Sequence, residues 1–203
     1  MAAFGLLLAL MEPEAKLQDE FDDWYDLEHI PHMSAVDGIS SAQRFIAIEG
    51  WPRYAALYDL DEVGVLTSAS YRAVTGGGFS PWSRRMLQHV RGWRRLTFEQ
   101  LQPGRASLLD TSGALGIALL TGLEPAGALA DWLGREPSTL QVRTYAPAAS
   151  GPAAVLWEAG SIGSLARPPD TLLRESTWSA RLIRYSRPDP ASAFARLEAS
   201  GSP

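Results

Sequence analysis

The residues best suited to chemistry lie in one stretch of this chain, residues 20–36 (EFDDWYDLEHIPHMSAV). Two of the chain's three histidines fall there, among acidic and aromatic side chains. An imidazole exchanges protons near neutral pH, a carboxylate can orient it, and a phenol can donate to a developing oxyanion. We therefore expect acid/base catalysis in which His29 is the general base or acid. Glu28 or Asp22 would orient the imidazole, and Tyr25 would be a proton donor.

Other interpretations of the same histidines are weaker. His29 could simply bond the last carbonyls of its helix, which helix ends favour. With His32 and Glu28 it could bind a metal, but Pro31 interrupts the helical spacing and the sequence offers no third strong ligand. His89 could be a single haem ligand, although a polar residue before a strand is the simpler interpretation. We expect no metal and no cofactor.

The candidate substrate-binding residues are aromatic or cationic. Arg44 falls on a predicted strand after the histidines, where a guanidinium could hold a carboxylate or phenolate. Aromatic side chains are the usual walls of small-molecule sites. The full set of candidates is Trp24, His32, Arg44, Tyr58, Trp82 and Arg85.

Bulk composition excludes several classes of protein. The 203 residues include no cysteine, so disulfides, thiolate metal sites and cysteine nucleophiles are excluded. The net charge of −5 argues against nucleic-acid binding, which needs a basic face. The apolar run at residues 2–11 is too short to span a bilayer and has no basic flank, so it predicts a buried strand in a cytoplasmic protein.

The elements that must position these residues follow a ferredoxin-like order. Leu17, Phe21 and Trp24 form the apolar stripe of a first helix, which we expect to break near His29 because of Pro31. Hydrophobic patterning predicts strands at 4–11, 39–48, 53–60 and 92–101, with helices at 12–29, 61–72 and 81–87. The order β-α-β-β-α-β is the ferredoxin-like pattern.

The second half of the chain repeats this order. It predicts strands at 115–121, 139–145, 152–158 and 178–185, a helix at 124–133 and a Pro-broken helix at 161–167 and 170–173. Glu12-Pro13 is echoed by Glu124-Pro125, which indicates a duplication. We therefore predict an α+β protein of tandem ferredoxin-like (βαββαβ) repeats, with halves at 1–102 and 106–190 and a tail at 191–203. The second half lacks the Tyr and Glu-His residues, so chemistry belongs to the first.

Residues 22–45 (DDWYDLEHIPHMSAVDGISSAQRF) resemble the EthD-like branch of the dimeric α/β-barrel superfamily. Proteins of that branch often carry Trp-Tyr-x-x-Glu-His-aliphatic-Pro, then a glycine turn and a strand with arginine. The matching positions are Trp24, Tyr25, Glu28, His29, Ile30, Pro31, Gly38 and Arg44. Residues 54–62 and 80–95 also look like that group. The resemblance implies that two four-stranded sheets close a barrel, within one chain or between the chains of a homodimer.

The resemblance leaves several activities open, because related barrels include cofactor-free monooxygenases, lactone isomerases, haem enzymes and polyketide cyclases. The residues favour proton transfer, of lyase, isomerase or cyclase type, on an apolar or aromatic oxygenated small molecule in the barrel cavity. The alternatives are a cofactor-free or haem-dependent monooxygenase and a non-catalytic barrel that binds a small ligand.

Overall fold

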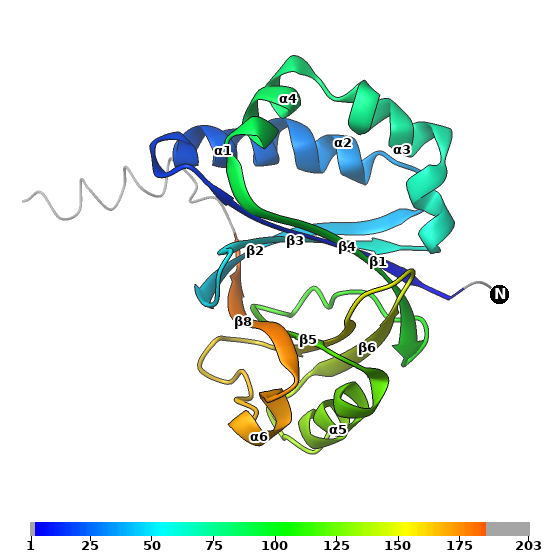
Figure 1. Cartoon of the computed structure of the whole chain (residues 1–203), viewed down its shortest axis with the longest axis vertical. Coiled ribbons are helices and arrows are strands. Elements are labelled where there is room, and N and C mark those ends of the chain that lie inside the picture. The colour runs from blue at the N-terminus through cyan, green and yellow to red at the C-terminus, as the bar shows by residue number, and fades with distance from the viewer. Residues whose placement is uncertain (1–2, 186–203) are drawn as a thin grey trace, which may run out of the picture.

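The computed structural model describes residues 3–185, which form an α+β fold around a closed antiparallel barrel (Figure 1). Around the barrel the strand order is β1-β3-β2-β8-β5-β7-β6-β4. The bounds are β1 Gly5–Pro13, β2 Ile39–Glu49, β3 Tyr54–Leu60, β4 Val90–Gln102, β5 Ala114–Leu120, β6 Gln141–Pro147, β7 Ala153–Ala159 and β8 Ser176–Arg184. All eight predicted strands are present, so the predicted fold class is confirmed.

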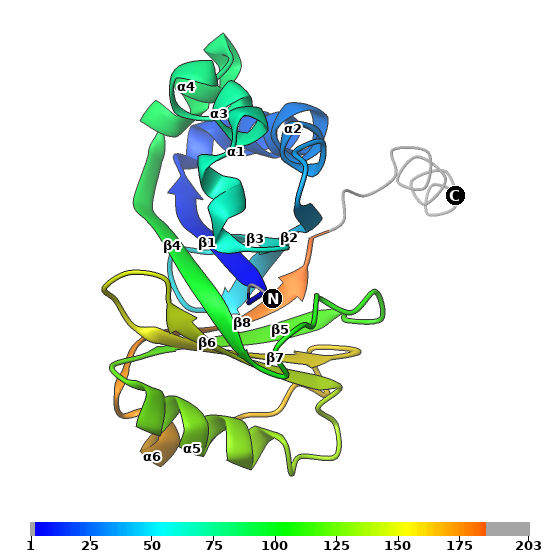
Figure 2. The same cartoon turned by 90° about the vertical axis from the view of Figure 1, so that its right-hand side faces the viewer.

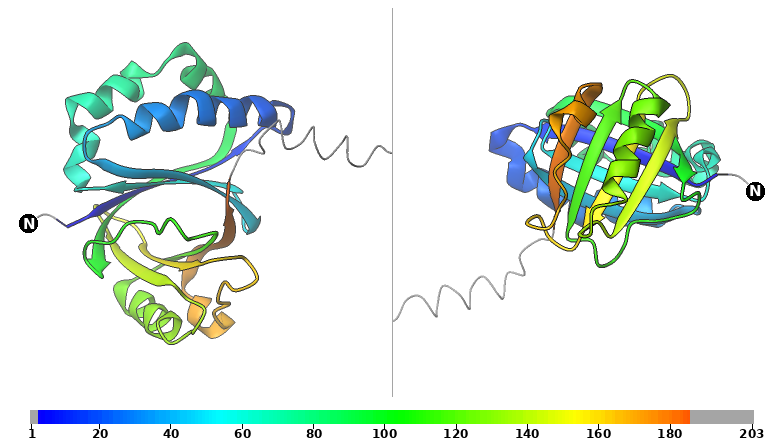
Figure 3. Two further views of the ribbon diagram at one scale, coloured as in Figure 1. Left: turned by 180° about the vertical axis from the view of Figure 1, so that it is seen from behind. Right: turned by 90° about the horizontal axis from the view of Figure 1, so that it is seen from below.

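The helices cover the barrel from two opposite sides. Those between β1 and β4 lie on one side, and α5 and α6 lie on the other (Figure 2). In the view from below, α5 lies over the strands of the second half (Figure 3). The bounds are α1 Gln18–Trp24, α2 Ile30–Ser34, α3 Ala69–Val74, α4 Pro81–Gln88, α5 Leu123–Leu133 and α6 Asp170–Leu173. Within residues 3–185, none of these helices has the length and apolarity needed to cross a lipid bilayer.

The barrel closes within one chain. Strand β2 pairs with β8, where Phe45 faces Arg184, and β4 pairs with β6, where Phe98 faces Pro147. These two seams join the four strands of the first half to the four of the second. A second copy of the chain is therefore not needed to complete the sheet. The predicted tail at 191–203, and residues 186–190 of the predicted second half, lie outside the described residues.

Apolar side chains fill the barrel. One buried cluster draws residues from every strand, and β1 contributes Leu6, Leu8 and Leu10, each 0% exposed. An eight-stranded barrel is just wide enough for its inward side chains to fill. The prediction of a substrate cavity inside the barrel is therefore wrong. Residues 7, 9 and 11 of β1 belong to a different cluster, between the sheet and the helices of the first half.

A buried ion-pair network crosses the barrel interior between the halves. Arg143, fully buried on β6, lies 2.7 Å from Asp59 of β3 and 3.1 Å from Glu158 of β7. The backbone N–H of Leu108 donates to Asp59 at 2.8 Å, and that of Leu109 donates to Glu158 at 3.0 Å. Asp59 belongs to the first half of the chain, whereas Arg143 and Glu158 belong to the second. The network therefore links the two halves.

The first helix differs from its prediction in a way that shapes the site. Strand β1 extends to Pro13, and the helix does not break at His29. Instead α1 passes into a π-helical turn at Tyr25–His29 and continues as α2. Pro31 has no N–H to donate to the preceding turn, and the wider turn bonds the N–H of Ile30 to the carbonyl of Tyr25.

Two other predicted helices are shorter than expected. The helix predicted at 61–72 is divided into a 3₁₀ segment, Val63–Thr67, and α3. Residues 161–165 form a turn and residues 166–169 have no regular secondary structure, so only the 170–173 part of the last predicted helix is helical. Pro168 and Pro169 separate the two parts, and the residue before a proline is disfavoured in the helical region.

Candidate functional site

The candidate site is a cavity of about 280 Å³ between the outer face of the first sheet and the helices above it. Its floor comes from Leu7, Ala9 and Met11, the outward residues of β1. Successive strand residues point to opposite faces, so this floor alternates with the side chains that fill the barrel. The walls are Trp24, Tyr25, His29, Met33, Tyr58, Tyr71, Thr75, Gly76, Phe79, Leu87, Trp93 and Arg95.

The π-helical turn brings His29 and Tyr25 to the same cavity. The imidazole stacks on Trp24, with ring centroids 4.7 Å apart and planes 28° apart. The ring of Tyr25 meets it edge-on, at 5.1 Å and 86°. Among the described residues, no side chain or backbone group forms a hydrogen bond with the ring nitrogens of His29. Both nitrogens therefore remain available to a ligand.

The environment keeps His29 neutral. Burial lowers its pKa from 6.5 to about 4, because a charged imidazolium is poorly solvated there. The Glu28 carboxylate opposes this shift without reversing it, and His32 and Arg44 add to it. At neutral pH the free imidazole can accept a proton but has none to give as an acid. Of the two predicted roles, this geometry supports that of a base.

Two buried phenols line the cavity with His29. Burial raises the pKa of Tyr25 to about 12, and it raises that of Tyr58 well above its ordinary value. Both hydroxyls therefore stay protonated and able to donate. Tyr25 donates to the sulfur of Met11 at 3.6 Å, a weak acceptor that a ligand oxygen can replace. The hydroxyl of Tyr58, a residue only 1% exposed, has no hydrogen-bond partner of normal geometry among residues 3–185, although the Tyr25 hydroxyl interacts with it and contributes to its raised pKa.

Glu28 supports the site from outside the cavity. Its carboxylate accepts from Ser80 at 2.6 Å and from Ser83 at 2.9 Å, at the start of α4. Ser83 in turn accepts from the indole N–H of Trp24 at 3.0 Å. Burial by itself would raise the pKa of Glu28, but the two serine hydrogen bonds lower it. Glu28 thus fixes the indole on which His29 stacks, and forms no hydrogen bond with the imidazole itself.

Asp22 and Arg44, predicted as orienter and anion anchor, do not line the cavity. Arg44 is only 4% exposed and forms ion pairs with Asp22 and, at 2.7 Å, with Asp26. Burial raises the pKa of Asp22 although Arg44 opposes the shift. The guanidinium also lies 4.5 Å from the ring centre of Tyr25. Two carboxylates already neutralise Arg44, so it supports the Tyr25 ring and leaves no charge for a substrate.

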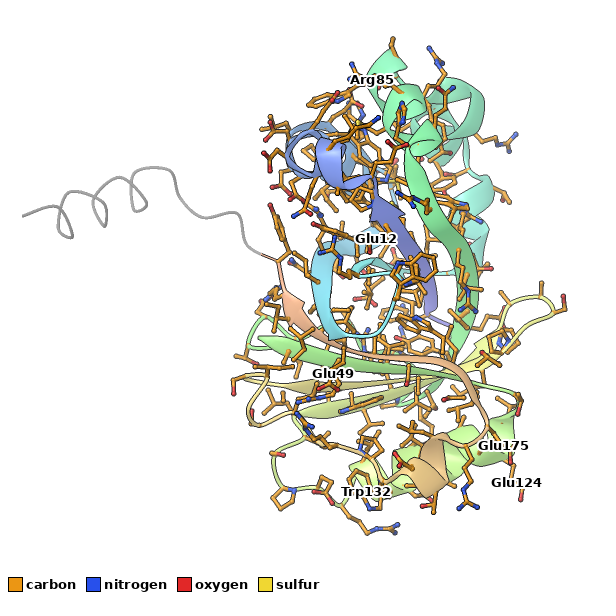
Figure 4. The ribbon with its side chains drawn as sticks, turned by 60° about the vertical axis from the view of Figure 1, so that its left-hand side comes forward. Glu12, Glu49, Arg85, Glu124, Trp132 and Glu175 are labelled. Atoms are coloured by element: carbon orange, nitrogen blue, oxygen red, sulfur yellow. The ribbon has the colours of Figure 1, made fainter. Side chains whose placement is uncertain are left out.

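Three other predicted binding residues also lie outside the cavity. His32 is exposed on α2, and Trp82 is half-buried on α4. Arg85 pairs with Glu20 at 3.0 Å on the outer edge of the helical layer (Figure 4). The structure therefore brings together His29, Tyr25, Trp24 and Tyr58, and leaves these three apart from them.

The sequence did not lead us to predict the cavity rim. This rim is formed by α3, β4 and the glycine segment before α4. Arg95 and the partly exposed Trp93 reach the cavity from β4. The register of the pairing between β1 and β4 shifts next to Trp93, which indicates a β-bulge. Gly92 adopts a φ of 60° at this bulge. A Cβ on Gly92 would lie 2.6 Å from the ring of Pro52. Glycine beside Trp93 was the available signal, because bulges redirect side chains next to sites.

These features define the class of fold, an α+β barrel of eight antiparallel strands whose two four-stranded halves lie in one chain. The structure is similar to that of an anthrone oxidase-like protein, with 9% identity, 92% of each chain covered and a TM-score of 0.62. A putative monooxygenase from Lactobacillus acidophilus NCFM has 8% identity over 90% of this chain and 94% of that one, with a TM-score of 0.57. A heme-binding protein from Thermus thermophilus has 8% identity over 98% of this chain and 96% of that one, with a TM-score of 0.56.

At these identities the similarity establishes the fold alone. No protein-family model matches the sequence, and no curated protein matches it either. The EthD-like branch remains a prediction from the sequence. The reaction must therefore be argued from this chain's own residues.

Within the described part of the chain, the cavity does not offer the three or more ligands of a protein-bound metal ion, and its volume is small for a haem. No group of three or more His, Cys, Asp or Glu side chains within residues 3–185 could hold a metal ion. The cavity of about 280 Å³ is slightly smaller than the roughly 300–1,000 Å³ of most small-molecule sites, which leaves little room for a porphyrin. His89 lies outside the cavity, with Nδ1 3.0 Å from Glu14.

Proposed function

We propose that this protein is a cofactor-independent enzyme that moves a proton on an apolar or aromatic, oxygenated small molecule. One observation carries the proposal: a neutral imidazole without a hydrogen-bond partner among residues 3–185 shares a cavity with two protonated, buried phenols. A base and oxyanion donors around an otherwise mainly apolar space are what the ionisation of a weak carbon acid requires. The lining comes from residues 7–95 of one chain, so the proposed site needs no homodimer partner.

In the proposed reaction, the carbonyl oxygen of the substrate accepts a hydrogen bond from Tyr58, and Tyr25 can add a second. A nitrogen of His29 removes a proton from the carbon beside that carbonyl. The electron pair of the broken C–H bond moves to the oxygen, and an enolate or phenolate forms. Return of the proton to another atom gives isomerisation, departure of a leaving group gives elimination, and attack on a second carbonyl gives cyclisation.

The low pKa of His29 suits an internal proton transfer. An imidazolium with a pKa of about 4 is a stronger acid than an ordinary imidazolium, so it returns its proton readily. The weak basicity of the imidazole must be offset by stabilisation of the oxyanion. The buried hydroxyl of Tyr58 supplies this best, since among residues 3–185 it has no partner of normal hydrogen-bond geometry to give up.

Cofactor-free oxygenation is the second candidate. The similarity in fold to an anthrone oxidase-like protein and to a putative monooxygenase favours it. The same deprotonated substrate would pass electrons to O₂, so this reaction consumes oxygen and proton transfer does not. A third alternative, a non-catalytic binding barrel, predicts binding without acceleration of either process.

Anthrone is a suitable probe, because it is a tricyclic ketone with an acidic methylene. We would follow exchange of the methylene protons in D₂O by NMR and oxygen uptake with an electrode, together with a panel of smaller aromatic ketones. We expect His29→Gln to slow the catalysed process by about 10²–10⁴-fold. Tyr58→Phe should slow it by about 10²–10³-fold.

His32→Gln is the matched control, because it removes an exposed imidazole three residues away and outside the cavity. It should retain the wild-type rate. Exchange without oxygen uptake supports proton transfer, and stoichiometric oxygen uptake supports the second candidate. A folded His29→Gln variant with wild-type rates would refute the proposal, as would a wild-type protein that accelerates neither process on any ketone of the panel.

A further inference from the structure

The rim of the cavity carries a positive charge that the proposed reaction does not use. Arg95 is the only charged side chain among the lining residues, since His29 is neutral and no Asp or Glu of residues 3–185 lines the cavity. It lies on β4 beside Ala9 of the cavity floor. Arg95 and Trp93 are both exposed, so Arg95 lies where the cavity opens to solvent.

The guanidinium of Arg95 is held in place without being neutralised. Its Nη2 donates to the hydroxyl of Tyr71 at 3.0 Å, and Tyr71 is itself a buried cavity residue. Within residues 3–185, no carboxylate forms an ion pair with Arg95. Arg44 is the contrasting case, because two carboxylates neutralise it. Arg95 thus keeps its charge and several N–H donors for a ligand.

We propose that Arg95 binds an anionic group of the substrate at the cavity rim, and that the substrate is therefore an aromatic or apolar acid. This inference rests on the proposed function, whose reacting centre it places at the buried end beside His29 and Tyr58. The anionic group lies at the open end, where Trp93 can stack on the adjoining ring. A planar guanidinium matches a carboxylate best, since it offers two parallel N–H donors to two oxygens.

In this arrangement the reacting end of the substrate is buried, and its anionic end is exposed to solvent. The buried phenols and the imidazole face a part of the cavity with apolar walls, where an unpaired substrate charge is costly. Arg95 lies at the solvent-exposed rim, where an anion keeps part of its hydration and gains a charge-assisted hydrogen bond. The rim thus selects the substrate and its orientation, and Arg95 takes no part in the proton transfer.

The test compares two probes of the same shape, 2-naphthoate and its neutral carboxamide, 2-naphthamide. Calorimetric titration of the wild-type protein at pH 7.5 should show the naphthoate binding about 10–100-fold more tightly than the amide, as a charged hydrogen bond implies. Arg95→Gln should abolish this preference by weakening the naphthoate alone. Raising the salt concentration should weaken the naphthoate and leave the amide unchanged.

Arg84→Gln is the charge-matched control, because Arg84 is exposed on α4 and outside the cavity. It should keep the preference for the naphthoate. If the wild-type protein binds both probes equally, or if Arg95→Gln retains the preference, the inference is overturned while the exchange experiment on His29 stands unaffected. If the wild-type protein binds neither probe and accelerates no exchange or oxygen uptake, the proposed function fails together with this inference.

Discussion

The low pKa of His29 can be measured through protein stability, without knowledge of the substrate. The folded protein keeps this imidazole neutral down to about pH 4, whereas the unfolded chain protonates it below about pH 6.5. The unfolded state therefore binds more protons between these two values. Its free energy falls relative to the folded state as the pH is lowered. The stabilising effect of a neutral His29 is complete above pH 6.5 and is lost as the pH approaches 4.

The expected magnitude follows from these two pKa values. The interval from 6.5 to about 4, at about 1.4 kcal/mol per pH unit, corresponds to about 3 kcal/mol in full. Between pH 7 and pH 5 the wild-type protein should lose about 2 kcal/mol of unfolding free energy through His29 alone. His29→Gln removes this titration and leaves the other acids and bases in place. The difference between the two proteins isolates the imidazole.

The assay is urea denaturation followed by tryptophan fluorescence at intervals between pH 7 and pH 4.5. The wild-type curve of stability against pH should be steeper than that of His29→Gln, and the two should differ most at the acid end. If the wild-type and His29→Gln curves stay parallel to within about 0.5 kcal/mol, His29 is not held neutral, and the reasoning about the base is refuted.

Two further predictions concern the scaffold. Arg143→Met should reduce the free energy of unfolding by about 3–5 kcal/mol, because it leaves two buried carboxylates without their cation. Arg85→Met breaks an exposed ion pair and should cost less than about 1 kcal/mol; equal losses in urea denaturation would contradict this account. Gly78→Ala should destabilise the cavity rim by about 1–3 kcal/mol, because its Cβ would clash with the carbonyl of Ala73. Gly77→Ala, with open space around its Cβ, should change the melting temperature little, and a larger loss there than at Gly78 would contradict the packing argument.

Local patterns were sufficient for the strands and for the existence of the helix that carries the proposed base. Runs of apolar residues with the strand period, separated by Pro and Gly turns, predicted all eight strands. The spacing of Trp24, Tyr25 and His29 placed them on one helix, and the structure brings all three to one cavity. These features depend on neighbours in the sequence, so the sequence contains the information needed to predict them.

The position of the cavity was not accessible in the same way. Strand β1 is apolar on both faces, so its pattern does not distinguish the face that fills the barrel from the face that forms the cavity floor. The π-helical turn depends on Pro31 at the second position of α2, which in sequence looks like a helix end. Sequence reasoning therefore expected His29 to face the barrel interior, whereas the structure places it against the outer face of the sheet.

What the sequence by itself determined is the order of strands and helices and the identity of the proposed base, because periodicity and motif spacing are short-range. Only the tertiary structure decided which arginine keeps a charge for a ligand. Arg44 and Arg95 are alike in sequence, each on a strand of the first half. Two carboxylates of the first helix neutralise Arg44, and none within residues 3–185 reaches Arg95. That difference arises from contacts between distant elements, and such contacts exist only in the folded chain.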